Sequence, residues 1–178
     1  MPFGVNFRNA ATSHPTDGPG FVAQTDTTAY SPSRGYGYID SGGVITRLRT
    51  TSIDPQICGF HYASGNGYKF RLDLLNGAGK YKLRAAFCDA TTNYRVGVRF
   101  FDGDTGVEIA ALKKTTSSGG NYTTILGNTG STSQFDRYKE DYIEHEFKSD
   151  HVLVVRDAYM QSGSCMISSV WAEPVVGI

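Results

Sequence analysis

The amino-acid sequence predicts an all-β protein, a two-sheet antiparallel β-sandwich of the jelly-roll type. Its 178 residues include 21 glycines and 11 tyrosines, with charged residues at 19%, a composition typical of turn-rich β proteins. Apolar and polar residues alternate over short segments that are separated by turn signals, and no helical crossover is evident between them. About ten short strands joined in this way favour two sheets packed face to face.

Alternation is strictest in segments 68–74, 81–87 and 96–100, where every second side chain is apolar and is expected to face the core. Glycine-containing turns at 76–79 and 102–106 separate these strands from the segments that follow them. The second turn, DGDTG, has a calcium-binding EF-hand loop as its alternative. It lacks the third acidic position, the Glu at position twelve and the flanking helices. A structural calcium ion is therefore unsupported, and no cofactor is predicted.

Further strands are expected toward both ends of the chain. They are segments 4–8, 21–25, 44–49, 107–112, 122–126, 140–148, 151–157 and 164–172. Segment 140–148 has a mixed period, because Ile143 and Phe147 lie four apart as on a helix, but its aromatic content favours a strand. Segments 115–120 and 127–133 are small and polar and are predicted to be loops.

Size and charge argue against several classes of partner. The chain shows no composition break, so a single domain spanning 1–178 is predicted. Its 17 basic and 17 acidic residues cancel without forming blocks, which argues against nucleic acid or an anionic membrane surface as a partner. We expect cytoplasmic synthesis without a signal peptide and no membrane insertion, since the sequence shows neither a leader pattern nor an apolar run of membrane-span length.

Three cysteines, Cys58, Cys88 and Cys165, cannot all pair within one chain, and none forms a CxxC motif. Reduced, buried thiols are the favoured interpretation. Intermolecular disulfides, or one internal bridge with a free thiol, are the alternative. The odd count leaves self-association open.

No catalytic motif is present, and the chain is predicted not to be an enzyme. A GxSxG elbow, an HExxH motif and a P-loop are all missing. The paired carboxylates Asp102/Asp104 and Glu144/Glu146 fit a turn and a solvated strand face. The histidines are scattered rather than set at ligand spacing: His14, His61, His145 and His151.

Binding chemistry is better represented. Segment 28–38 contains Tyr30, Tyr36 and Tyr38 among helix-breaking prolines and glycines, which predicts a loop that displays aromatic rings, with Tyr30 as its anchor. Segment 59–67 adds two aromatics and a histidine before a glycine-rich turn, and segment 88–94 adds a carboxylate, an amide and a phenol. Stacking faces combined with hydrogen-bonding groups suit a sugar ring, provided that the three loops converge.

The order of the segments FGVNFR, TAYSPSRGYGY, VITRLRTTSIDPQICGFHYASGN and FCDATTNYRVGVRFFDG resembles the malectin-like and carbohydrate-binding jelly-roll modules of the galactose-binding-like superfamily, over nearly the whole chain. In such modules three loops line a sugar site at one end of the sandwich. The resemblance implies these ligand-binding residues: Tyr36, Tyr38, His61, Tyr62, Asp89, Asn93 and Tyr94. Many related modules have a tryptophan where this chain has Tyr38, which implies a smaller stacking platform.

We therefore expect a non-catalytic module that binds a glycan or cell-surface polysaccharide. A free-standing sandwich without an export signal resembles small structural modules of phage virions, which implies a virion surface location, or an extracellular one after lysis. Contacts with other virion proteins or a homo-oligomer are then expected. The alternative is a purely structural decoration or cement protein of a capsid or tail, in which the tyrosine loops are buried in subunit contacts without sugar binding.

Overall fold

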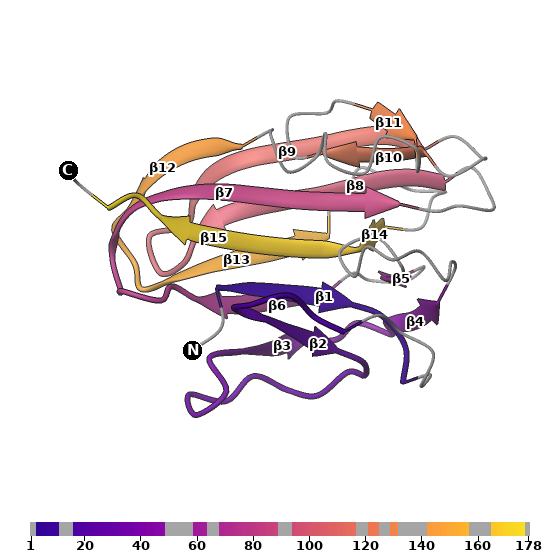
Figure 1. Cartoon of the computed structure of the whole chain (residues 1–178), viewed down its shortest axis with the longest axis horizontal. Coiled ribbons are helices and arrows are strands. Elements are labelled where there is room, and N and C mark those ends of the chain that lie inside the picture. Colours follow the sequence, from indigo (N-terminus) through magenta and orange to yellow (C-terminus); the bar gives the residue numbers. More distant parts are fainter. Residues whose placement is uncertain are drawn as a thin grey trace.

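The alternating segments form a β-sandwich, as predicted (Figure 1). The computed structural model describes residues 3–10, 16–48, 59–63, 68–88, 94–116, 121–124, 129–131, 142–156 and 165–176. No helix occurs within these ranges, and two large sheets pack against each other.

The larger sheet has seven strands, with the order β11-β10-β7-β15-β1-β2 and with β12 also paired to β7. Neighbours are antiparallel except β1 and β2, which run parallel. The strands are β1 (Gly4–Phe7), β2 (Phe21–Gln24), β7 (Gly79–Cys88), β10 (Asn121–Thr124), β11 (Thr129–Ser131), β12 (Ile143–Phe147) and β15 (Ser169–Pro174).

The second large sheet has five antiparallel strands in the order β3-β6-β13-β8-β9. They are β3 (Tyr36–Asp40), β6 (Lys69–Asp73), β8 (Tyr94–Asp102), β9 (Val107–Thr116) and β13 (His151–Arg156). The predicted hairpin at Asp102–Gly106 is confirmed, because it joins β8 to β9.

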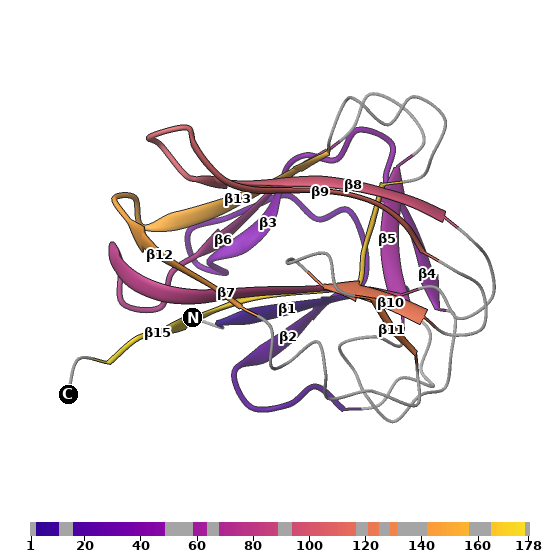
Figure 2. The same cartoon turned by 90° about the horizontal axis from the view of Figure 1, so that it is seen from above.

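A third, short sheet lies between the two large ones at one end of the sandwich (Figure 2). Its strands are β4 (Ile45–Leu48), β5 (Gly59–Ala63) and β14 (Cys165–Ile167), in the order β14-β5-β4. This third sheet was not predicted from the sequence. The predicted strand 164–172 is in fact two strands in different sheets, since the chain bends at Ser168 between β14 and β15.

The predicted faces of the central strands are confirmed where side chains are described. Buried side chains from β6, β7 and β8 and from Tyr68 and Leu74 beside β6 line the space between the sheets: Tyr68, Phe70, Leu72, Leu74, Tyr81, Leu83, Ala85, Val98 and Phe100. Val152 and Val154 of β13 and Phe147 of β12 belong to the same core, as do buried side chains of β1, β3, β5, β14 and β15. Segment 140–148, whose pattern fits both a helix and a strand, contains strand β12 at Ile143–Phe147, as expected.

Segment 28–38 corrects the prediction of a displayed tyrosine loop. Its last residues form β3, in which Tyr36 and Tyr38 face the core on either side of Gly37. The preceding residues fold back on this strand, with hydrogen bonds between Tyr30 N–H and the Tyr38 carbonyl (2.9 Å) and between Tyr38 N–H and the Thr28 carbonyl (3.1 Å). The two backbones approach so closely that a Cβ on Gly37 would lie 2.6 Å from backbone atoms of Tyr30.

Gly37→Ala is therefore expected to destabilise the protein by about 2 kcal/mol, since the residue has a φ of 142° and no room for a methyl group. Urea unfolding measures the change. Gly18→Ala is the matched control, because nothing lies within 4 Å of the added carbon. Equal unfolding midpoints for the two variants would show that the segment 28–31 does not pack on β3 in this way.

Candidate functional site

Two of the predicted sugar-binding residues lie together inside the protein. Tyr38 is 2% exposed and His61 is 0% exposed, so the expectation that they are displayed at the surface is wrong. The Tyr38 hydroxyl lies 2.7 Å from Nδ1 of His61, and Nε2 of His61 lies 2.8 Å from the carbonyl oxygen of Arg8. These groups can be buried together because each buried polar group needs a hydrogen-bond partner, and Tyr38, His61 and the Arg8 carbonyl are partners for one another.

The surroundings fix the protonation of His61. The Arg8 carbonyl can only accept, so Nε2 carries the hydrogen, and Nδ1 accepts from the Tyr38 hydroxyl. Burial lowers the pKa of His61 to about 4, against the opposing effects of the hydrogen bond to Arg8 and the charge of Asp26. Burial likewise raises the pKa of Tyr38 well above its usual value. This pair is neutral and structural at neutral pH.

The other predicted ligand residues do not come together in a site within the described part of the chain. Tyr36 is half-buried at the start of β3, with the Arg34 guanidinium 4.4 Å from its ring centre. Tyr62 is half-buried in β5, with its ring 5.9 Å from that of Phe60. Three more candidates cannot be placed: Asp89 and Asn93 lie outside the described residues, as does the side chain of Tyr94. His14 and Cys58 and the side chains of Cys88 and Cys165 also lie outside the description.

Tyr30 anchors its segment, as predicted. Its hydroxyl donates a hydrogen bond to Oδ2 of Asp73 (2.9 Å), and the Arg71 guanidinium lies 4.4 Å from the centre of its ring. Arg71 also pairs with Oδ1 of Asp73 at 2.6 Å. Burial, together with the hydrogen bond to Asp73, raises the pKa of Tyr30. The ring and the hydroxyl of Tyr30 are therefore engaged in contacts within the protein and not with a ligand.

The outer face of the five-stranded sheet carries an open depression of about 220 Å³. On β13, Val152 and Val154 face the core while Leu153 and Val155 face outward. Register places Phe101 of β8 beside Leu153. The lining residues are Lys69, Phe101, Gly103, Gly106, Leu153 and Val155. Phenyl and aliphatic side chains with a neighbouring ammonium group suit an apolar side chain better than a sugar, whose hydroxyls each need a polar partner.

At one end of this depression two turns are joined by Asp102. The β8–β9 turn and the β12–β13 turn lie together at the end of the sandwich opposite the short sheet (Figures 1 and 2). The Asp102 carboxylate accepts hydrogen bonds from the backbone N–H groups of Lys148 (2.7 Å) and Ser149 (3.1 Å) and from Nε2 of His145 (3.3 Å). Burial acts to raise the pKa of Asp102, but these hydrogen bonds outweigh it and lower the pKa.

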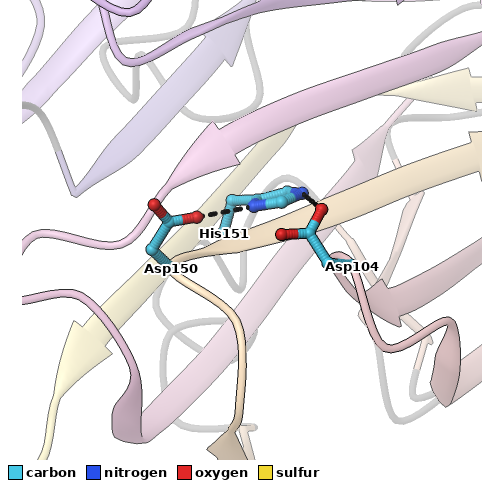
Figure 3. A group of neighbouring side chains, drawn as sticks. All are labelled: Asp104, Asp150 and His151. Atoms are coloured by element: carbon cyan, nitrogen blue, oxygen red, sulfur yellow. Dashed lines mark hydrogen bonds and ion pairs between the residues drawn. The ribbon is translucent and has the colours of Figure 1, made fainter.

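His151 lies at the same junction, with a carboxylate at each ring nitrogen (Figure 3). Oδ1 of Asp150 is 2.8 Å from Nδ1, and Oδ1 of Asp104 is 3.7 Å from Nε2. The imidazole is only 3% exposed, whereas the side chains of Asp104 and Asp150 are 85% and 65% exposed. No sequence motif predicts this group: the only local signal is the Asp-His pair at 150–151, and Asp104 joins it through the fold.

The described histidines do not form a catalytic relay. Their hydrogen-bond partners are a phenol, a backbone carbonyl and carboxylates, and none of these is an activated nucleophile. The absence of enzymatic activity stays a prediction.

Comparison of the chain with models of known protein families, with curated proteins and with solved structures gives no match. The resemblance to malectin-like modules therefore also stays a prediction. Within the described part of the chain, no helix has the length and apolar character needed to cross a membrane.

The pKa of His61 predicts how stability depends on pH. Native His61 stays neutral down to about pH 4, while the unfolded residue takes up a proton near 6.5, so the unfolded state binds more protons between these values. The free energy of unfolding should therefore fall by roughly 3 kcal/mol as pH decreases from 6.5 to 4. Urea unfolding across this range measures it. In His61→Gln, which cannot titrate, the slope should be smaller, and equal slopes would contradict the assignment.

Asp102→Asn tests the turn junction. The amide keeps the shape of the carboxylate but loses its charge, so we expect a loss of about 2 kcal/mol in unfolding free energy. Asp104→Asn, the same change at an exposed position of the same turn, is the control and should alter stability by less than about 0.5 kcal/mol. Thermal unfolding of both variants measures this difference. Similar midpoints would mean that the turns are held together by packing alone.

Proposed function

We propose that this chain is a non-catalytic structural module that assembles with copies of itself through the outer face of its five-stranded sheet. The observation that carries the proposal is the depression around Phe101, Leu153 and Val155, where apolar side chains point away from the core. Side chains of this kind on a solvated sheet face are typical of a protein contact surface.

The internal position of Tyr38 and His61 supports this function over sugar binding. A glycan site needs accessible rings and hydrogen-bonding groups, and two of the four candidates whose side chains the structure describes are buried. Tyr30 and Tyr36 are already in contact with Arg71 and Arg34. Of the two functions that the sequence indicates, the structural one therefore has more support. A place on a virion surface is a proposal that rests on the sequence pattern.

Charge favours a second copy as the partner. The chain has 17 basic and 17 acidic residues, so copies do not repel one another through net charge. Register places exposed Lys69 beside exposed Asp40 at one side of the depression, and Arg99 is paired with Glu108 at the other. A surface with both signs around an apolar centre can match its own copy about a twofold axis, as an isologous contact requires.

Leu153→Glu tests this function by sedimentation velocity over a range of protein concentrations. The wild-type chain should sediment as an oligomer, and the variant should shift to the monomer, because a carboxylate would be buried at the contact. Val176→Glu is the matched control, since Val176 is 79% exposed and does not line the depression. It should leave the oligomer unchanged. Thermal unfolding confirms that both variants are folded.

A wild-type chain that stays monomeric at every concentration would contradict the proposed function. A glycan array with the same three proteins separates the remaining cases. Glycan binding by the wild type that Leu153→Glu abolishes would assign the face to a sugar, and glycan binding that survives would place a sugar site elsewhere. Either result on a monomeric protein would replace self-assembly with glycan binding.

A further inference from the structure

The two nitrogens of His151 have different partners. Nδ1 lies within hydrogen-bond distance of Asp150, at 2.8 Å, whereas the 3.7 Å between Nε2 and Asp104 is too long for a hydrogen bond (Figure 3). The side chain of His151 is only 3% exposed. A buried imidazole thus points one nitrogen at a carboxylate that it does not contact directly.

The proton of neutral His151 is on Nδ1. The Asp150 side chain is 65% exposed, and an exposed carboxyl is ionised at neutral pH and can only accept. Nε2 is then left with its lone pair facing an oxygen of Asp104. Two acceptors placed in this way repel each other unless a cation, a proton or a donating water lies between them.

We propose that His151 Nε2 and the carboxylate of Asp104 bind a first-row divalent metal ion such as Zn²⁺, with water completing its coordination. Zinc lies about 2.0 to 2.2 Å from imidazole nitrogen and carboxylate oxygen, so two ligands of a tetrahedral ion are roughly 3.4 Å apart. The distance of 3.7 Å between Nε2 and Oδ1 needs only a small movement of the exposed Asp104 side chain. The site adjoins the depression, which Gly103 lines, but neither Asp104 nor His151 lines it.

Asp150 acts as the orienting group for this site. A histidine that binds a metal commonly donates its other N–H to a carboxylate, which fixes the tautomer and makes the ligand nitrogen more basic. The hydrogen bond of 2.8 Å from Nδ1 to Asp150 has this arrangement. Asp150 is therefore a positioning residue, and His151 and Asp104 are the ligands.

Charge favours a cation at this place. A Cβ on Gly103 would lie 2.4 to 2.6 Å from Nε2, Cε1 and Cδ2 of His151, so only glycine can pack against the face of this ring, and the in-plane direction of Nε2 is left to Asp104. The ionised groups against the imidazole are the carboxylates of Asp104 and Asp150, and the guanidinium of Arg71 lies 3.4 Å from Asp150. Among the described residues, the imidazole is the only basic side chain paired with Asp104, so the charge of Asp104 attracts a divalent cation.

A proton on Nε2 is the competing occupant, because an imidazolium ion would also bridge the two carboxylates. Isothermal titration of the full chain with ZnCl₂ at pH 7.5, after removal of metal with EDTA, distinguishes the two. We expect a saturable site of one equivalent that is absent or at least tenfold weaker in Asp104→Asn and in His151→Asn. Asp150→Asn should weaken it about tenfold. At pH 5.5 the wild-type affinity should fall, since the proton displaces the metal.

His145→Asn is the matched control, because His145 pairs with Asp102 in the same junction but is not a ligand, and it should keep the site. Asp104 is 85% exposed, so its variant is expected to fold even if His151→Asn does not, which thermal unfolding establishes. Zinc held by the cysteines would remain in every variant. The proposal is wrong if the wild type shows no saturable zinc binding, or if Asp104→Asn binds this equivalent as tightly as the wild type does.

Discussion

His61 lies where the three sheets of this protein meet, and the end of the sandwich that carries the short sheet depends on its two hydrogen bonds. Tyr38 belongs to the five-stranded sheet, His61 to the short sheet, and Arg8 follows the first strand of the seven-stranded sheet. Each group is a donor or an acceptor that burial would otherwise leave without a partner, which costs about 1 to 3 kcal/mol per group. One neutral tautomer of one imidazole satisfies both neighbours, so the three sheets have a single relative arrangement at this point.

At the opposite end of the sandwich, the ionised carboxylate of Asp102 joins the two large sheets. Asp102 belongs to the five-stranded sheet, while the backbone groups of Lys148 and Ser149 that it accepts from lie where the chain crosses from β12 in one large sheet to β13 in the other. The middle of the molecule is apolar, and its hydrophobic contacts carry no direction. Directional polar contacts at the two ends therefore decide how the sheets are positioned, and the second of these ends also brings His151 next to Asp104.

The sequence was sufficient for what depends on local periodicity. Strict alternation predicted β6, β7 and β8 and the faces of their side chains, because a solvated sheet imposes a period of two. It was insufficient for β3, since Pro32 and Gly37 have the appearance of turn residues, and the strand is formed by pairing with β6 and with the segment that folds back on it. Tyr38 was predicted to contact a ligand, whereas the fold buries it against His61. Asp104 and His151 meet for the same reason, which no spacing motif records.

The segment that folds back over β3 has a consequence for solubility. β3 is the edge of its sheet, and an edge strand offers free N–H and C=O groups to any extended chain that passes. On the open side of β3, the N–H of Tyr38 donates to the carbonyl of Thr28, and the carbonyl of Tyr38 accepts from the N–H of Tyr30. The molecule thus supplies its own strand partner, and the small size of Gly37 protects this edge against strand addition by other molecules and hence against fibrous aggregation.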